Sequence, residues 1–406
     1  MRGRDKPRIA VVSPFLDKQH GTERCVAEQL ERLAWDYEIH LYTSRVEDMD
    51  LSKIVLHRVP ALPGPHLFAY MWWFAANHFQ RWWDLRFRGL KYELLYTPGI
   101  NCWDADVISV HIVFAEFVER VRDGLRFGSN PVKIWPTLLH RRMYYALIKM
   151  LERRTYSREG LPLVVVSKKV AADLERYYDR NTHLSLVYHG WDRERFGRAR
   201  RANLRTQARR ELGLEQNNFV LLLVGNDWKK KGLLCLLEAV RQLANPELHI
   251  LVVGTDTRAP YLASLQRAGL AERVQFLPPR RDVEFYYAAT DAYIGPSLED
   301  AFAMPPLEAM ACGVPVIVSR QAGVSEVITH GVDGLLLEDS QDDLVLASLI
   351  HELYANHDLR QRLGENASNT ALKYTWKGNA EQLRAVFDAI LGVGPRATRC
   401  PAAVRC

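Results

Sequence analysis

The chain alternates short apolar runs with longer amphipathic segments, a pattern that predicts strands separated by helices. In the first half the apolar runs cover residues 8–13, 39–43, 54–58, 93–97, 106–110 and 163–167. In the second half they cover residues 219–225, 248–253, 274–277, 291–295 and 315–319. Because several runs are apolar at every position, they indicate parallel strands buried on both faces. With 406 residues, the sequence predicts an α/β protein of two domains.

Residues 296–319 combine a strand end, an acidic loop, a short helix and a second strand. Pro305 and Pro306 suit the first turn of the helix, where a missing amide hydrogen costs little. Gly313 suits the left-handed position that ends it. The unpaired N–H groups at the helix start favour a phosphate, and Asp300 and Glu308 flank that start. The stretch therefore favours a phosphate site beside two acids.

This stretch resembles the acidic motif of the retaining glycosyltransferases of family 4, which have the two-Rossmann GT-B architecture. In that motif an acid is followed, after seven residues, by Glu and then Ala-Met-Ala-Cys-Gly-x-Pro-Val, as in residues 300–316 here. The resemblance extends from Arg8 to about Leu391. It implies an α/β GT-B fold, with two Rossmann-like doubly wound domains facing an inter-domain cleft. The implied parts are an acceptor domain (1–190), a nucleotide-sugar donor domain (191–375), a terminal helix crossing back to the first domain (376–391) and a flexible tail (392–406).

The resemblance also implies roles for individual residues. Glu308 would bind the ribose hydroxyls, and Asp300 would bind hydroxyls of the donor sugar. His111, at the end of the strand 106–110, would contact that sugar from the first domain. The groups implied to face the donor diphosphate are Gly21 and Thr22, Asn226 and Lys231, and the N–H groups of Phe302, Ala303 and Met304. Arg280 lies in the loop 278–282, where the family contacts the nucleotide base.

Several positions depart from the family pattern. The family usually has Glu-Gly-Phe-Gly where this chain has Asp300-Ala301-Phe302-Ala303, and Asn226 stands where an arginine is usual. His189 and Trp191 depart from the usual Pro-Asn-Gly-Val-Asp segment. Glu299 is an alternative first acid, one position out of register with Glu308. These departures keep open a weakly active or inactive homologue that acts as a binding or scaffold protein.

Charge and cysteine content limit the partners and cofactors. All of the excess positive charge lies in residues 1–195, which hold 30 basic and 24 acidic side chains. Such an excess favours an anionic partner. Six scattered cysteines without metal-like spacing indicate a reducing compartment and no metal site. The family needs no metal, so we expect no cofactor other than the nucleotide-sugar substrate.

Three segments combine basic residues with aromatic or polar ones. Residues 67–91 and 133–158 mix tryptophan or tyrosine with Lys and Arg. Both are compatible with docking on an anionic membrane surface or with an ordinary helix whose aromatic side chains are buried. No nucleic-acid motif accompanies them. Residues 193–210 hold eight arginines, and we expect a solvated connector helix there. The helix after the first strand is expected at 22–34, with Thr22 as its N-cap.

The resemblance therefore implies a metal-independent, retaining hexosyltransferase. It would transfer a sugar from a nucleoside-diphosphate sugar to the hydroxyl of a lipid-linked or cell-envelope glycan. A GT-B sugar-nucleotide epimerase, a glycogen-type phosphorylase and the scaffold protein remain alternatives. The polar start of the chain predicts a cytoplasmic location, with the inner face of a membrane as an open alternative. The donor base, the sugar and the linkage cannot be read from the sequence.

Overall fold

A computed structural model describes residues 6–121, 133 and 135–393 of the chain. It divides into two compact units, which are described one at a time. Unit 1 comprises residues 1–165, 171–187 and 379–406, and unit 2 comprises residues 166–170 and 188–378. The chain thus passes from unit 1 to unit 2 three residues before the predicted boundary at 190. Most of the tail predicted at 392–406 lies outside the described residues.

Unit 1 contains a parallel sheet of seven strands in the order β5-β3-β1-β6-β7-β8-β9. These strands are β1 (Arg8–Val12), β3 (Glu38–Thr43), β5 (Ile54–Arg58), β6 (Leu94–Pro98), β7 (Val107–Val110), β8 (Leu163–Val165) and β9 (Leu184–Leu186). Two short strands, β2 (Phe15–Leu16) and β4 (Arg45–Val46), pair separately. The predicted run 54–58 is confirmed at both ends, while β2, β4 and β9 have no clear apolar run in the sequence.

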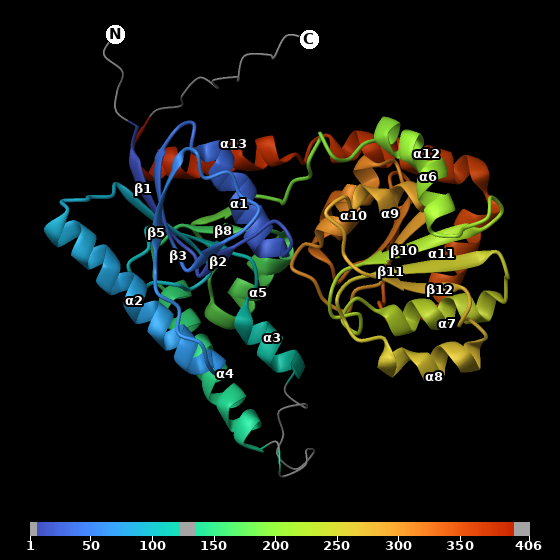
Figure 1. The fold of residues 1–406 in the computed structure, drawn as a ribbon, viewed down its shortest axis with the longest axis horizontal. Coiled ribbons are helices and arrows are strands. Elements are labelled where there is room, and N and C mark those ends of the chain that lie inside the picture. Colours follow the sequence, from blue (N-terminus) through green and yellow to red (C-terminus); the bar gives the residue numbers. More distant parts are fainter. Residues whose placement is uncertain (1–5, 122–132, 134, 394–406) are drawn as a thin grey trace, which may run out of the picture. The chain divides into compact units, whose positions relative to one another are not determined.

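Helices cover both faces of this sheet (Figure 1). They are α1 (Gly21–Leu33), α2 (His66–Phe87), α3 (Phe114–Val121), α4 (Trp135–Tyr156), α5 (Lys168–Tyr178) and α13 (Trp376–Ile390). The apolar side of α1 packs on Ile9, Val11 and Ile39, together with Phe387 of α13. Asp84 of α2 lies at the other face, where it accepts a 2.7 Å hydrogen bond from Tyr42.

The prediction that Thr22 caps α1 is wrong. The helix begins at Gly21, and its N-cap residue is His20. Asp17 organises the preceding turn instead, because its carboxylate accepts hydrogen bonds from the N–H groups of Gln19 and His20. Burial raises the pKa of Asp17, but the hydrogen bonds from His20 and Gln19 outweigh it, so the pKa is lowered. Asp17 therefore fixes the loop as a charged group, and Thr22 lies inside the first turn.

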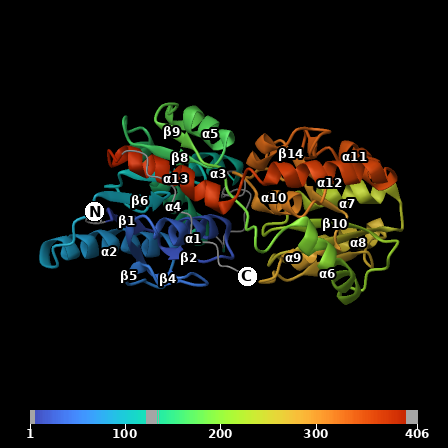
Figure 2. The ribbon, with the colours of Figure 1, turned by 90° about the horizontal axis from the view of Figure 1, so that it is seen from above.

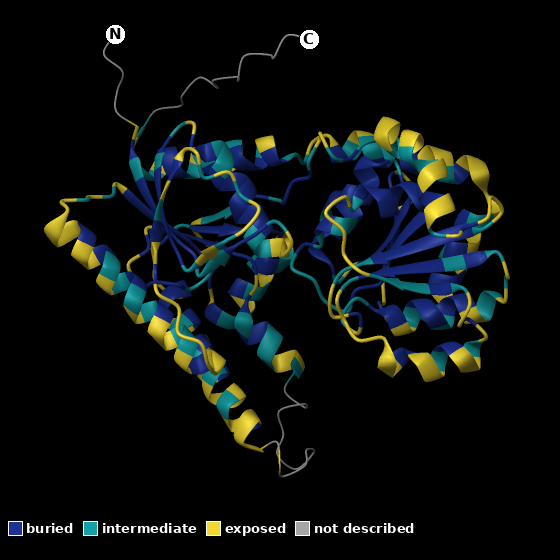
Figure 3. Cartoon of the chain, in the orientation of Figure 1, coloured by how far each residue is buried: buried dark blue, intermediate teal, exposed yellow. Residues whose placement is uncertain are grey.

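Unit 2 contains a parallel sheet of six strands in the order β12-β11-β10-β13-β14-β15. The strands are β10 (Phe219–Val224), β11 (Leu248–Val253), β12 (Val274–Leu277), β13 (Ala292–Gly295), β14 (Val316–Ser319) and β15 (Leu335–Leu337). Counted along the chain, this is the order 3-2-1-4-5-6 of a doubly wound Rossmann sheet. The sheet is buried on both sides (Figure 3), as the continuous apolar runs predict.

Helices α7 and α8 lie on one side of this sheet and α9 and α10 on the other (Figure 1, with the view from above in Figure 2). The helices are α6 (Arg198–Glu211), α7 (Leu233–Leu243), α8 (Ala259–Ala268), α9 (Glu284–Ala289), α10 (Met304–Ala311), α11 (Asp343–Ala355) and α12 (His357–Ala371). A 3₁₀ helix, η4, spans Gly323–Val327. The predicted proline start and glycine stop of α10 are confirmed, since Pro lies at its first positions and Gly313 has φ +67°.

Helix α6 corrects the prediction of a solvated connector. Arg201, Arg205 and Arg209 recur every four residues and therefore share one face of the helix. Arg201 and Arg205 donate to the carbonyl of Thr290, at 2.7 and 3.0 Å. Arg209 donates to the carbonyl of Ala289 at 3.0 Å. Carbonyls at a helix end lack intrahelical partners and carry partial negative charge, so α6 supplies cations to the end of α9.

Arg209 provides a test of this correction. It is 7% exposed and also donates to the carbonyl of Asn218 and to Asp291. Arg209→Met would remove the arginine donor from the carbonyls of Ala289 and Asn218 and one cation from Asp291, and we expect the free energy of unfolding to fall by about 3 kcal/mol. Arg210→Met, at the exposed neighbouring position, should change it by less than ~0.5 kcal/mol. Urea denaturation followed by circular dichroism measures the free energy of unfolding of both variants. Equal losses would contradict a stabilising role for the contacts that Arg209 makes from the buried face of α6.

Candidate functional site

The switch point of the unit 2 sheet lies between β10 and β13. In open α/β sheets, ligands bind outside the carboxyl ends of the strands at this point. Two loops meet there, 225–232 after β10 and 296–303 after β13. Leu298 donates its N–H to the carbonyl of Lys230 at 2.8 Å. Gly232 has φ +77°, and a Cβ there would lie 2.0 Å from the carbonyl oxygen of Pro296. Only glycine permits this approach, which brings the predicted residues of both loops together.

Lys231 and Asp300 form an ion pair across the two loops. The alkyl chain of Lys231 lies against Gly225, where a Cβ would be 2.7 Å from Cε. The second oxygen of Asp300 is 3.2 Å from the N–H of Phe302 and accepts its hydrogen bond. The structure therefore places a cation and an acid, both predicted from the sequence, at one point of the site. The N–H of Phe302 is used by Asp300 rather than left open for a phosphate.

Glu299 has a different environment from Asp300. Its carboxylate lies 3.3 Å from the Lys169 ammonium group and 3.9 Å from that of Lys230. The Glu299 side chain is 8% exposed, whereas that of Asp300 is 20% exposed. Glu299 therefore holds two lysines in place, and Asp300 is the more accessible of the two neighbouring acids.

The backbone of the acidic loop is fixed by hydrogen bonds to η4 and to the start of α5. The Asp300 carbonyl accepts from Gly323 at 3.1 Å, and the Phe302 carbonyl accepts from Val324 at 2.6 Å. Ser167 donates its hydroxyl to the carbonyl of Ala301 at 2.6 Å. Ser167 was not singled out by the sequence, because nothing local distinguishes a serine after a strand. The backbone of the loop is thus held by η4 and by the residue that precedes α5.

Helix α10 begins beside this loop. Ala303 precedes the helix with φ +68°, a region that L-residues rarely adopt. The N–H groups of Ala303 and Met304 have no acceptor within the helix, since they lie at its start. Glu308, one turn further, is 3% exposed and accepts a 2.8 Å hydrogen bond from the Tyr287 hydroxyl. Burial and the nearby Glu308 carboxylate raise the pKa of Tyr287 well above its ordinary value, so this hydroxyl remains a donor.

The remaining predicted residues of unit 2 have other partners. The Asn226 side-chain oxygen accepts from the N–H and the hydroxyl of Thr255, both at 2.9 Å. It therefore joins the loops after β10 and β11. Arg280 is exposed, pairs with Asp282 at 2.8 Å and lies 4.0 Å from the centroid of the Phe285 ring. Asn226 does not replace the cation of the usual arginine, and Arg280 is held by its neighbours Asp282 and Phe285.

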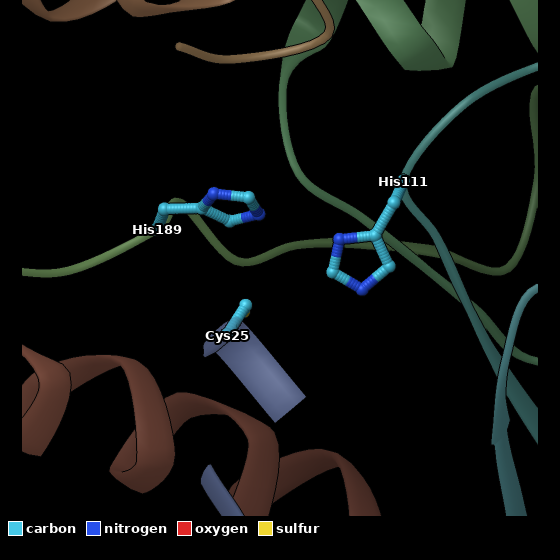
Figure 4. Close-up of side chains that lie close together, drawn as sticks. All are labelled: Cys25, His111 and His189. Atoms are coloured by element: carbon cyan, nitrogen blue, oxygen red, sulfur yellow. The ribbon is translucent and has the colours of Figure 1, made fainter. Parts of the chain in front are cut away.

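Unit 1 carries the other predicted residues. His111 directly follows β7 and is 7% exposed. Cys25 of α1 and His111, both labelled in Figure 4, present ligand-type atoms within 4.8 Å of each other. Burial raises the pKa of the Cys25 thiol, which keeps it protonated. Gly21 is exposed and Thr22 half-buried at the start of α1. These residues lie at the carboxyl edge of the unit 1 sheet.

His189, the third residue labelled in Figure 4, belongs to unit 2. Its ring centroid is 5.1 Å from that of Phe302 and 6.2 Å from that of Trp376. It therefore packs against the acidic loop through Phe302. The sequence showed His189 only as a departure from the family pattern, because its contacts come from residues more than a hundred positions away.

Residues 205–370 match the family model described as "Glycosyl transferases group 1". This part of the chain is similar to the group 1 glycosyltransferases. It contains Lys231, Asp300 and Glu308, so the resemblance found in the sequence is confirmed. The matched region ends before α13 and includes every strand of unit 2.

Characterised relatives agree with this assignment. The D-inositol 3-phosphate glycosyltransferase of Corynebacterium jeikeium is 33% identical over 255 residues, covering 59% of this chain and 60% of that protein. The enzyme of the same name from Thermobifida fusca is 30% identical over 244 residues, covering 56% and 55%. The chain therefore spans less than two thirds of the length of the relatives it matches.

Solved structures identify the fold. The glycosyltransferase WaaG, described as involved in lipopolysaccharide biosynthesis, superposes with a TM-score of 0.76 at 20% identity, over 95% of this chain and 100% of that one. Anabaena HepE in complex with UDP-glucose gives a TM-score of 0.70 at 19% identity, over 94% and 99%. The predicted GT-B fold, with two Rossmann-like units, is confirmed.

The backbone of Ala303 supplies a test of the acidic loop. A non-glycine residue at positive φ is strained by about 1 kcal/mol or more. We expect Ala303→Gly to raise the free energy of unfolding by roughly 0.5 kcal/mol, after the entropy cost of glycine is deducted. Ala301→Gly, at a position without positive φ, should lower it by a similar amount. Thermal unfolding compares the two variants, and a loss of stability in both would contradict the strain at Ala303.

Proposed function

We propose that the chain is a retaining glycosyltransferase that moves a sugar from a nucleoside-diphosphate sugar to an acceptor hydroxyl. The similarity to the group 1 glycosyltransferases supports this proposal, as do the names of the relatives. HepE, which shares the fold, was solved with UDP-glucose. The observation that carries the proposal is the ion pair of Lys231 and Asp300 at the switch point of unit 2, beside the start of α10.

This arrangement suits the departure of a diphosphate. Negative charge grows on the leaving diphosphate as its bond to the sugar breaks, so fixed positive groups lower the barrier. Lys231 supplies one such group, and the N–H groups at the start of α10 supply partial positive charge. Because these groups provide the charge compensation, the proposed reaction needs no metal ion.

Asp300 has two roles in the proposed reaction. Before the donor binds, it neutralises Lys231 and holds the ammonium group in place. When the diphosphate binds Lys231, it replaces Asp300 as the partner of the ammonium group. The two oxygens of the Asp300 carboxylate can then accept hydrogen bonds from sugar hydroxyls. Asp is one methylene shorter than the usual Glu, so the sugar must come closer to this loop.

Glu308 and His111 complete the proposal. Glu308 accepts a hydrogen bond from Tyr287, and its carboxylate would also accept a ribose hydroxyl. His111, at the carboxyl edge of the unit 1 sheet, would contact the donor sugar. A residue from each unit is then needed for transfer, so the proposed reaction requires the two units to close on the donor.

The acceptor is proposed to be a lipid-linked or cell-envelope glycan, reached from a membrane surface. Helix α2 exposes Phe68, Phe79 and Trp82 by 57%, 61% and 53%. The exposed positions form a band along the helix (Figure 3), and Arg86 and Arg88 lie at its end. None of the helices in the described ranges is long and apolar enough to cross a bilayer. Exposed aromatic and basic side chains suit the interface of an anionic membrane.

The roles of the two acids are tested by matched variants. Asp300→Asn should lower turnover at least about a hundredfold, because a neutral amide cannot replace the carboxylate. Glu299→Gln should lower it less than about tenfold, since Glu299 only positions lysines. Transfer and hydrolysis are measured with UDP-, GDP- and ADP-sugars in the presence of EDTA. Equal losses in the two variants would contradict the alignment that makes Asp300, and not Glu299, the first acid of the motif. Activity that appears only without EDTA would contradict metal independence. The absence of turnover with every donor would favour a binding protein.

Membrane docking is tested separately by liposome sedimentation. The double variant Phe79→Ser/Trp82→Ser should reduce pelleting with anionic vesicles at least about fivefold, because each side chain contributes buried apolar area. Trp35→Ser is the control, since Trp35 is 58% exposed but lies outside α2. Pelleting that does not depend on anionic lipid, or that falls equally in the control, would contradict docking through α2.

A further inference from the structure

Unit 2 has a pocket of about 660 Å³ at the edge of its sheet opposite the candidate site. Asp291 and Pro315, which directly precede β13 and β14, form part of its wall. The other walls come from α6 and α12. Since Lys231 and Asp300 follow the carboxyl ends of the strands, the pocket at the amino ends is a separate place in the fold.

Arginines dominate the wall of this pocket. Arg198, Arg201 and Arg205 come from one face of α6, and Arg360 comes from α12. The acids in the wall are Asp291 and Glu365, so the four guanidinium groups exceed the carboxylates by two.

Two of the four arginines are already neutralised by these acids. Arg205 pairs with Asp291 at 2.5 Å, and Arg198 pairs with Glu365 at 2.9 Å. These pairs account for both carboxylates of the wall. The charge that an additional anion would meet must therefore come from the other two arginines.

Arg201 and Arg360 donate to backbone carbonyls. Arg201 contacts the carbonyl of Thr290 at 2.7 Å, and Arg360 contacts that of Tyr354 at 2.8 Å. Within the described part of the chain, neither has a carboxylate within ion-pair distance. Each guanidinium has five N–H groups, so donors remain after these contacts.

Arg201 shows the charge imbalance most directly. Its Nε is buried and has no hydrogen-bond partner. Burial and the neighbouring Arg205 lower the pKa of Arg201 to about 10. A buried cation beside a like charge is costly unless an anion compensates it.

Gly313 makes room for this cluster. A Cβ at Gly313 would lie 2.7 Å from Cγ of Arg198, so the side chain of Arg198 passes over the glycine. The same residue ends α10 with φ +67°. The glycine of the acidic motif thus serves the pocket as well as the helix end.

We propose that this pocket binds a small phosphate-bearing anion with at least two negative charges, a diphosphate being a suitable size. The planar fork of arginine matches phosphate oxygens, and two uncompensated guanidinium groups match a dianion. His357, also in the wall, accepts a 3.2 Å hydrogen bond from Arg360 through Nδ1 and so positions that guanidinium group. The site does not depend on the proposed transfer reaction, because it shares no residue with the donor loops.

The test uses the full chain and inorganic pyrophosphate, with binding measured by isothermal titration calorimetry. The double variant Arg201→Gln/Arg360→Gln should weaken binding at least about tenfold, because it removes the two guanidinium groups without a carboxylate partner, whereas Arg210→Gln on the exposed side of α6 should not change it. Because pyrophosphate could also bind at the donor loops, Lys231→Ala is titrated in parallel and should retain the arginine-dependent binding.

Three results would overturn the proposal. One is the absence of pyrophosphate binding to the wild-type chain at low salt. Another is binding that the double variant leaves unchanged. The third is binding lost in Lys231→Ala alone, which would assign the diphosphate to the donor loops. Circular dichroism of each variant verifies that it is folded before its affinity is compared.

Discussion

The close approach of the loops after β10 and β13 is the constraint on which the candidate site depends. β10 and β13 are neighbours in the sheet, but the strand order reverses between them, and this topology leaves a crevice between the loops that follow them. Gly232 closes it, because its missing side chain lets the backbone lie against Pro296. The ion pair of Lys231 and Asp300 then forms across the contact. Any side chain at position 232 would separate the cation from the acid.

The two neighbouring acids of the motif, Glu299 and Asp300, have different environments. Glu299 is fixed between Lys169 and Lys230, and Asp300 has a single lysine and greater exposure. Two lysines hold the Glu299 carboxylate in one position. Asp300 pairs with Lys231, and a bound ligand can replace this partner. The strained Ala303 fits this arrangement, because strain of about 1 kcal/mol persists only where surrounding contacts enforce the backbone.

The sequence predicted the buried strands well and the polar contacts poorly. Strands such as Leu248–Val253 and Val274–Leu277 were placed correctly because a charged residue precedes each run and a glycine or proline follows it. The pairing of Lys231 with Asp300 could be expected only from the family resemblance, since 69 positions separate them. Thr22 was wrongly given the N-cap because Asp17 organises the turn from outside the helix. The buried face of α6 was missed because arginines at helical spacing look the same whether they face water or the carbonyls of another helix.

Helix α10 links the two arginine- and lysine-rich regions of unit 2. It has eight residues and is therefore only about 12 Å long. Its start, with partial positive charge, faces the donor loops, and its end carries partial negative charge. The carbonyl of Gly313, just beyond that end, lies 3.4 Å from Arg201. Arg201 therefore compensates the end of α10, and its Nε remains without a hydrogen-bond partner beside the pocket. An anion bound in the pocket would therefore contact the same guanidinium that compensates the end of α10.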